Sequence, residues 1–411
     1  MRNSLLLFLR LASRNLLRNR TRTFLNLTMV IGAFSAIVVS RGFAHYIMRS
    51  TEVSFTQGQN GHIQIAKTSI WDDDLPKHKE DAYIEKSSEL QKTLLDIPQI
   101  ALASGRANTF VLLINGDKSI SAFALGYDTD VEKNIEESLS FVEGGHFSKG
   151  QKFEILLTAG LQKSLHLSIG QNLSVISQTL SGSMSSVDLE VKGVVKTGFA
   201  DLDNSTVYIP LKIAQKLLGT NRIERIAIIL NKDASLEESL AKVKDSVRDK
   251  TGLIIKGWKE TATFFNQLAQ FYSIQNVLVE MILFTLVFFG ILNTLGMSIY
   301  ERIGEIGTLR ALGDRTETVL FQIILEGILL GAIGTMMSAP ISAFIAYGIS
   351  SFEIMITLPG ASRPMPIHIE PAARDYLVAS LVVCISCLIA SLWPAQKAVR
   401  LSIVDALRAN S

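Results

Sequence analysis

The sequence predicts an α-helical membrane protein with four transmembrane helices and a large α/β extracytoplasmic domain. Composition gives the first indication: 48% of the 411 residues are hydrophobic, and the mean hydropathy is +0.29. A soluble globular chain rarely has such an apolar excess. The second indication is a set of four apolar segments, each long enough for the roughly 20 residues that a bilayer-crossing helix needs. The third is a polar stretch at residues 44–276, which is ample for a folded domain.

The four apolar segments are the expected transmembrane helices. They lie at residues 24–43, 277–299, 319–349 and 376–395. Charged residues are scarce in all of them, as expected of helices that face lipid. Pro340 in the third segment has no backbone N–H to donate, so we expect a kink toward the far end of that helix.

The distribution of arginine predicts the orientation. Residues 1–23 contain no acidic residue and six arginines: Arg2, Arg10, Arg14, Arg18, Arg20 and Arg22. The positive-inside rule therefore places this segment in the cytoplasm. The four spans then place the loop 300–318 and the tail 396–411 in the cytoplasm, and 44–276 and the loop 350–375 outside. A cleavable signal peptide is the alternative for the first span, but the lead is long and no clear small-x-small cleavage site follows it.

Residues 1–23 also have a helical pattern. Arginine recurs every four residues, at Arg10, Arg14, Arg18 and Arg22, while leucines supply apolar area. This spacing predicts an amphipathic helix on the inner membrane surface. The alternative is that the arginines only fix the topology.

The exported domain shows the same order of elements twice. A strand at 61–66, a helix at 84–97 and a strand at 109–114 are followed much later by a strand, helix and strand across 224–257. Two such β-α-β units can pair into one subdomain. The strand-rich middle, about 115–205, would then form a second one.

The stretch ERIGEIGTLRALGDRTE, residues 301–317, is unusually polar for a segment between two membrane spans. It predicts a helix of about three turns at 301–312 that ends at Gly313, since glycine favours helix C-termini. Such a helix is too short to be stable alone in water. We therefore expect it to dock on the membrane surface or on a soluble partner.

Several motifs resemble one family. The sequence ERIGEIGTLRALGDRTETVLFQIILEGILLGAIG, residues 301–334, resembles the signature of FtsX-like and MacB-like ABC transporter permeases. The layout also matches: one span, a large periplasmic domain and three more spans. The stretches at 58–66, 156–176 and 187–219 look like the LolC and LolE branch, whose members release lipoproteins from the inner membrane with a separate ATPase.

The resemblance implies a structure and a set of partners. The exported domain would have a porter-like subdomain at about 57–114 and 206–258, and a Sabre-like subdomain at about 115–205. The chain would lie in the bacterial inner membrane as a homo- or heterodimer with a second permease subunit. It would work with a cytoplasmic ABC ATPase of the LolD or MacB type, which binds ATP and Mg²⁺, and with a periplasmic acceptor or adaptor. The implied ATPase-coupling residues are Glu301, Arg302, Glu305, Ile306, Leu309, Arg310 and Gly313.

The residues themselves argue against catalysis by this chain. No GxxxxGK[ST] motif occurs, although backbone amides and a lysine in that frame are what hold phosphates; NGDKS at 115–119 lacks the glycines. The six histidines have no ligand spacing, so no metal site is expected. Near charge balance, +2 overall, gives no nucleic-acid footprint. Cys384 and Cys387 are best interpreted as small packing residues in a membrane helix.

Two acidic residues within the spans are candidate functional residues, because a charge at mid-membrane costs roughly 2.5–3.5 kcal/mol on insertion scales. Glu326 matches the glutamate of the family motif, and we expect it to bond the coupling region rather than transfer protons. Glu280 lies near the outer end of the second span, where it can reach the interface.

A helix is also expected at 259–275, leading into the second span. Its large apolar residues are Phe264, Phe265, Leu268, Phe271 and Tyr272. One interpretation is an ordinary packing helix. The other is a stalk that carries motion from the membrane to the exported domain and contacts cargo acyl chains.

The expected function is that of a non-catalytic permease subunit. It would use mechanotransmission to extract lipoproteins or similar amphiphiles from the outer leaflet of the inner membrane and pass them to a periplasmic acceptor. Two alternatives remain: a MacB-like tripartite efflux permease, and an FtsX-like signalling subunit that controls a cell-wall hydrolase.

Overall fold

The computed structural model describes most of the chain in two compact units. The described residues are Arg14, Arg18, 20–67, Ile70, 79–85, 87–150, 152–231, 233–248, 252–312, 316–357, 361–362 and 364–400. One unit comprises Met1–Met48, Leu268–Ile354 and Pro366–Ser411, and the other comprises Arg49–Gln267 and Met355–Met365. We call them the helical unit and the α/β unit.

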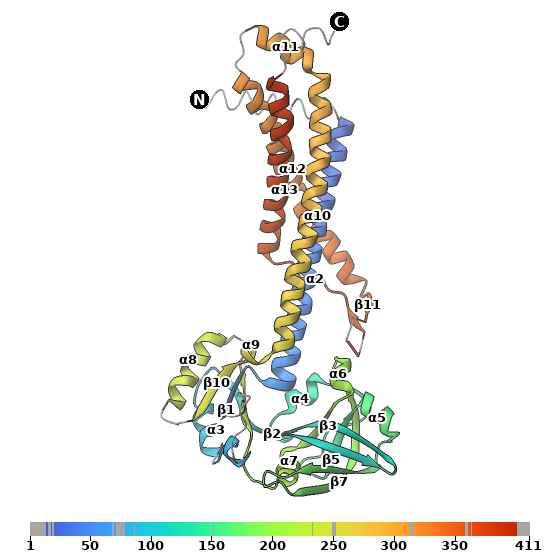
Figure 1. Cartoon of the computed structure of the whole chain (residues 1–411), viewed down its shortest axis with the longest axis vertical. Helices are drawn as coiled ribbons and strands as arrows, with labels where there is room; N and C mark the ends of the chain where they lie inside the picture. Colours follow the sequence, from blue (N-terminus) through green and yellow to red (C-terminus); the bar gives the residue numbers. More distant parts are fainter. Residues whose placement is uncertain are drawn as a thin grey trace. The chain divides into compact units, whose positions relative to one another are not determined.

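Four long helices dominate the helical unit (Figure 1). They are α2 (Arg20–Val53), α10 (Thr263–Glu301), α12 (Thr316–Ser351) and α13 (Ala373–Arg400). Each is long and apolar enough to cross a membrane, which confirms the predicted fold class. The helices extend past the predicted spans; α2 begins at Arg20, so residues 20–23 continue into the first span without a break. Residues 1–13, 15–17 and 19 of the predicted N-terminal helix lie outside the described residues.

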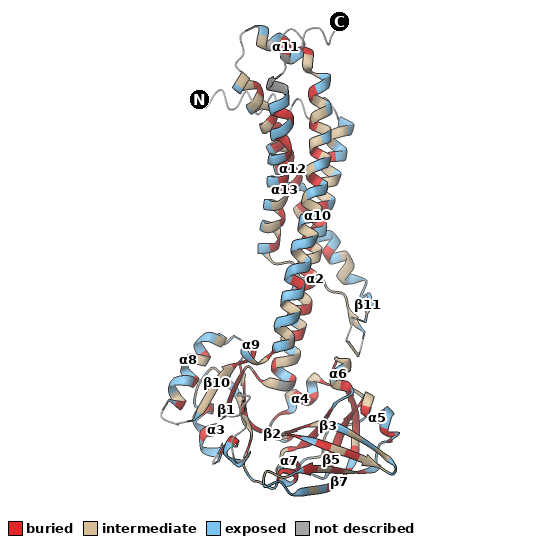
Figure 2. Ribbon diagram, in the orientation of Figure 1, coloured by how far each residue is buried: buried red, intermediate tan, exposed pale blue. Residues whose placement is uncertain are grey.

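The four helices share one apolar core. It contains Phe34 and Ile37 of α2, Ile291 of α10, Leu330 of α12 and Val383 of α13, together with their neighbours. Figure 2 shows the buried residues on the facing sides of these helices. The core supports the side-by-side arrangement of the four helices, as expected of a bundle whose members bury one stripe each.

Small residues allow α12 and α13 to approach closely. A Cβ added at Gly327 would lie 2.7 Å from Ser391 Cβ, and one at Gly331 would lie 3.2 Å from Cys387 Sγ. Cys387 is fully buried at this contact. Small residues at helix contacts are typical of membrane bundles, so the geometry fits the packing interpretation of the cysteine pair.

The first part of the α/β unit is a four-stranded sheet with the order β10-β1-β9-β2. Its strands are β1 (Ile63–Lys67), β2 (Ile100–Asn115), β9 (Arg225–Leu230) and β10 (Leu253–Gly257), and its helices are α3 (Ser87–Leu95) and α8 (Leu236–Val247). All the pairs are antiparallel. The two predicted β-α-β units therefore do pair with each other, around a core that includes Ile65, Leu94 and Val243.

The second part is a closed ring of six strands, β2-β3-β8-β5-β7-β6, in which β6 pairs with both β7 and β2. The further strands are β3 (Lys118–Tyr127), β5 (Glu154–Thr158), β6 (Asn172–Gln178), β7 (Met184–Lys196) and β8 (Thr206–Pro210), with β4 (Ser140–Gly144) beside β7. Closure leaves no free edge within the ring. The 16 residues of β2 serve both parts: its first half pairs with β9, and its second half with β3 and β6.

The ring extends beyond the predicted middle segment, 115–205. It takes in β8 and the helix α7 (Leu211–Leu218), whose buried face includes Ile213, Ala214 and Leu217. These residues join the core of the ring because the i, i+1, i+4 spacing puts them on one side of the helix. The remaining elements are η1 (Ser54–Asn60), η3 (Lys79–Ala82), α4 (Lys133–Ser138), α5 (Ala159–Leu165), α6 (Ala200–Asp203), α9 (Trp258–Thr261), α11 (Ile303–Ala311), β11 (Met355–Ile356) and β12 (Met365–Pro366).

Candidate functional site

The predicted coupling helix corresponds to α11, Ile303–Ala311. Glu301 is the last residue of α10. The helical geometry is interrupted at Arg302, whose φ and ψ are −108° and 9°, and α11 begins at the next residue. Glu305 lies in the first turn of α11 and Arg310 in the last. Both positions are favourable, because the helix dipole is positive at its N-terminus and negative at its C-terminus.

One side of α11 is open and the other is covered. Glu305, Thr308 and Leu312 are exposed, and their i, i+3, i+7 spacing puts them on one face; Gly304 and Gly307 are buried. Leu312 is 81% exposed. Thr308 and Leu312 were not among the predicted coupling residues. Of the predicted coupling residues, Gly313 and the side chains of Ile306 and Leu309 lie outside the described part of the chain.

Two arginines near the N-terminus pair with the predicted coupling acids. Arg18 donates from Nη2 to Glu305 Oε1 at 2.8 Å and from Nη1 to Oε2 at 3.4 Å. Arg22 makes the same two-pronged contact with Glu301, with an Nη1–Oε2 distance of 2.8 Å. The hydrogen bond from Arg18 lowers the pKa of the Glu305 carboxyl below its usual value. Glu301 and Glu305 are therefore bound within the chain by two ion pairs, Arg22–Glu301 and Arg18–Glu305, which we call the clamp.

Glu326, the acid predicted in the third span, accepts a hydrogen bond from Arg302 Nη1 at 3.3 Å. Both side chains are nearly buried, with exposed fractions of 7% and 12%. Arg302 sits at the break between α10 and α11, so this pair ties the break to α12. The pair joins Glu326 to Arg302, one of the predicted coupling residues, and the structural role of Glu326 stays a prediction.

Glu280, the acid predicted in the second span, belongs to a three-residue cluster. Arg41 Nη1 lies 2.5 Å from Glu280 Oε1, and Arg41 Nε lies 3.0 Å from Asp375 Oδ1. Asp375 Oδ2 also accepts the backbone N–H of Ala372 at 2.8 Å. One guanidinium thus joins α2, α10 and α13. Sequence reasoning missed Arg41 and Asp375, although a lone arginine within an apolar span is a signal that it needs a partner.

The predicted stalk residues differ in their exposure and contacts. Phe265 packs edge-on against Trp258, with ring centroids 4.6 Å apart. Tyr272 is 9% exposed whereas its neighbour Phe271 is 60% exposed, and their rings pack edge to face with centroids 5.6 Å apart. Leu268 is half-buried, and the side chain of Phe264 lies outside the description.

An apolar face of α10 remains uncovered. Only 11% of its most hydrophobic stretch is buried, against 44% for α12. Spacings of three, four and seven residues put the large exposed side chains on one side of the helix: Phe271, Ile274, Leu278, Met281, Ile282 and Phe289. This face is available to lipid, to an apolar ligand or to another membrane helix. Within the described residues, no group of three or more His, Cys, Asp or Glu could hold a metal ion.

Comparisons with known proteins support two domains. The MacB-like periplasmic core domain matches residues 23–246, more than half of the chain, and the FtsX-like permease C-terminal domain matches residues 278–403. Solved extracytoplasmic domains are similar at low scores: that of the YknZ transporter from Gram-positive bacteria (TM-score 0.35, 13% identity, 47% of this chain and 99% of that one) and the periplasmic region of MacB from Actinobacillus actinomycetemcomitans (0.36, 17%, 50% and 94%).

Full-length relatives are distant but extensive. The ABC transporter permease YtrF of Bacillus subtilis is 22% identical, over 96% of this chain and 97% of its own length. The lipoprotein-releasing system transmembrane protein LolC of Xylella fastidiosa is 21% identical, over 72% and 75%. The macrolide export ATP-binding/permease protein MacB of Escherichia coli is 23% identical, over 97% of this chain and 60% of its own. The chain belongs to the family of ABC transporter permeases that combine a MacB-like periplasmic core domain with an FtsX-like permease domain.

Proposed function

We propose that this permease extracts lipoproteins or similar amphiphiles from the outer leaflet of the bacterial inner membrane and passes them to a periplasmic acceptor. The observation that carries the proposal is the uncovered apolar face of α10, which runs from Phe271 to Phe289. A second permease subunit covers part of this face in a dimer, and acyl chains of the cargo enter beside it. Apolar surfaces that pack closely against this face contribute to such binding through van der Waals contacts.

Two helices provide the route for mechanotransmission. α2 and α10 each contain residues of both units without interruption. α2 leads directly into η1, a π-helical segment, and this type of distortion is frequent at functional sites. Movement of the spans would therefore reach the α/β unit through continuous hydrogen-bonded helix rather than through a flexible linker.

The energy comes from a separate cytoplasmic ABC ATPase of the LolD or MacB type, which binds ATP and Mg²⁺. This chain contains no P-loop motif, so its own role is non-catalytic. The ATPase docks on the exposed face of α11 formed by Glu305, Thr308 and Leu312. The clamp to Arg18 and Arg22 and the bond from Arg302 to Glu326 connect that face to α2 and α12.

Release from proteoliposomes tests the proposal. The chain is reconstituted with its co-purifying ATPase and a fluorescent lipoprotein, and a soluble acceptor is added outside. We expect ATP-dependent transfer of the lipoprotein, and none when the ATPase is omitted. The matched control is the same cargo without acyl chains, whose transfer to the acceptor should not depend on ATP. ATP hydrolysis that transfers neither cargo would contradict the proposal.

Efflux is the second candidate, because the similarity to the macrolide export protein MacB spans 97% of this chain. In that case ATP would drive loss of a small amphiphile such as a macrolide, and acyl chains on a protein cargo would make no difference. The same proteoliposomes, loaded with erythromycin instead of lipoprotein, distinguish the two functions.

A further inference from the structure

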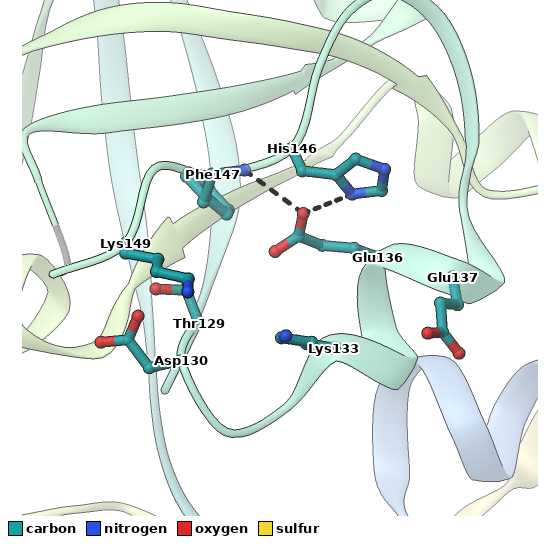
Figure 3. A pocket seen from close by; sticks show the side chains of 8 residues that line it. All are labelled: Thr129, Asp130, Lys133, Glu136, Glu137, His146, Phe147 and Lys149. Carbon is teal, nitrogen blue, oxygen red and sulfur yellow. Dashed lines mark hydrogen bonds and ion pairs between the residues drawn. The ribbon is translucent and has the colours of Figure 1, made fainter.

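A cavity of about 600 Å³ opens between α4 and the loop that follows β4, within the α/β unit (Figure 3). One wall comes from the turn after β3, with Thr129 and Asp130. A second comes from α4, with Lys133, and the third is formed by the loop residues Phe147 and Lys149. The cavity plays no part in the proposed transport mechanism.

Two carboxylates fix the shape of the cavity. Glu136 Oε2 accepts from His146 Nδ1 at 2.7 Å and from the backbone N–H of Phe147 at 3.3 Å, as Figure 3 shows. Asp130 Oδ1 accepts from the backbone N–H of Gly150 at 3.2 Å. The loop is therefore held at both ends, and the cavity is preformed rather than made by a mobile side chain.

Three hydrogen-bond donors that line the cavity have no partner among the described residues. Thr129 is 7% exposed, and its Oγ1 has no hydrogen-bond partner among the described residues. A buried hydroxyl without a partner is costly, so its retention calls for an explanation. Lys133 and Lys149 are exposed, their ammonium groups make no hydrogen bond or ion pair within the described part of the chain, and Lys133 points into the cavity in Figure 3.

The cavity lining also contains negatively charged side chains. Besides the two lysines, the lining contains three acids, Asp130, Glu136 and Glu137. Only one oxygen of Asp130 accepts a hydrogen bond from a described residue. With both signs present at close quarters, an anion alone would be opposed by Asp130, and a cation alone by the two lysines.

We propose that this cavity binds a small zwitterion, a molecule with an oxyanion group and an amino group on a short linker. Lys133, Lys149 and the Thr129 hydroxyl bind the oxyanion, which is a phosphate or a carboxylate. Lysine binds either group as a point charge. Asp130 binds the amino group, and the Phe147 ring covers the linker.

The test measures binding to the full chain in detergent at neutral pH and constant ionic strength, from the rise in unfolding temperature with ligand concentration. The probes are 2-aminoethyl phosphate, β-alanine, inorganic phosphate and ethanolamine. We expect one zwitterion to bind more tightly than inorganic phosphate or ethanolamine, and the better of the two zwitterions identifies the oxyanion. Equal binding of inorganic phosphate would contradict the role of the amino group, and no binding by any probe would overturn the proposal.

Variants separate the contributions. Lys133→Ala with Lys149→Ala should weaken binding by at least about tenfold, whereas the charge-matched control Lys163→Ala with Lys244→Ala should not. Asp130→Asn keeps an acceptor for Gly150 but removes the charge, so it should abolish the advantage of the zwitterion over phosphate. Thr129→Val should weaken binding by about tenfold without lowering the unfolding temperature of the free protein. Unchanged zwitterion binding in the variant with Lys133→Ala and Lys149→Ala would also overturn the proposal.

Discussion

Arg18 Nη2 lies 2.8 Å from Oε1 of Glu305, a residue 287 positions later in the sequence. Arg22 makes the same kind of contact with Glu301. The residue number rises from 18 to 22 in one segment and falls from 305 to 301 in the other, so the two segments run antiparallel. In each segment the two charges are four residues apart, although the interruption at Arg302 separates Glu301 of α10 from Glu305 of α11. The described arginines Arg18 and Arg22 of the N-terminal segment are thus matched to the predicted coupling acids, in addition to the predicted role of this segment in topology.

The Arg18–Glu305 pair predicts a measurable titration. In the folded protein the pKa of Glu305 is lowered by its hydrogen bond with Arg18. Arg18→Gln should raise this pKa toward the usual value of about 4.3. A carbon-13 NMR titration of glutamate-labelled protein measures it. Arg20→Gln, at a neighbouring exposed arginine, is the control and should leave the pKa of Glu305 unchanged; an equal shift in both variants would show that the pairing is not specific.

Arg41 should be more important for stability than either acid that it binds. Arg41→Ala leaves Glu280 and Asp375 without their shared cation; removing one partner of a buried ion pair costs about 3–5 kcal/mol, and we expect a smaller loss for this partly buried cluster. Glu280→Gln should cost less, because Asp375 still balances the guanidinium. Reversible unfolding in detergent micelles gives both free energies. An Arg41→Ala protein as stable as Glu280→Gln would refute the bridging role.

The Arg302–Glu326 bond predicts an order among substitutions at Glu326. Glu326→Ala should lower the free energy of unfolding by about 3 kcal/mol, because it leaves a nearly buried guanidinium without this acid. Glu326→Gln retains an acceptor oxygen and should lose less. If Glu326 served in proton transfer instead, Gln and Ala would reduce transport equally while leaving stability similar to that of the parent.

His62 predicts a pH dependence in the α/β unit. Burial lowers its pKa, and its Nδ1 accepts the backbone N–H of Leu230 at 3.3 Å, a bond that requires an unprotonated nitrogen. The unfolded chain, with a pKa of about 6.5 at this residue, binds the proton more readily. Stability from this group is therefore fully present above about pH 6.5 and decreases as the pH falls toward the lower, folded pKa.

The matched variant is His62→Asn, whose side-chain oxygen can still accept from Leu230 but does not titrate. Urea unfolding between about pH 5 and 8 should show a smaller loss of stability at the acidic end for this variant than for the parent. Identical pH profiles would mean that other groups cause the acid sensitivity.

The transmembrane part of the fold was predictable because hydropathy is a local property. A run of about 20 apolar residues identifies a span without knowledge of its neighbours. The four-stranded sheet was predictable in outline for a similar reason, since its two β-α-β units each show a regular pattern. The six-stranded ring was not predictable, because β3 pairs with β8 in parallel and β6 pairs with both β2 and β7, and such non-local pairings leave no mark in a sequence window.

The candidate site was predicted only in part. Glu301, Glu305 and Glu326 were named from the sequence, but their pairing with Arg18, Arg22 and Arg302 was not, because ion pairs between different segments of the chain depend on the tertiary fold. Thr308 and Leu312 of the open face of α11 were not among the predicted coupling residues, since exposure cannot be read from the residue type. The cavity around Thr129 has no sequence motif at all.

The measurement that most directly tests the central claim is the affinity of the partner ATPase for the chain in lipid nanodiscs, with and without the substitution Leu312→Ser. Leu312 is 81% exposed, so its loss should not affect folding, whereas burying a leucine at an interface contributes about 1.5–3 kcal/mol. The account predicts a dissociation constant at least about tenfold higher for Leu312→Ser, and no change for Leu95→Ser, an exposed leucine of the α/β unit. Unchanged affinity in both variants would contradict the claim that the open face of α11 receives the ATPase.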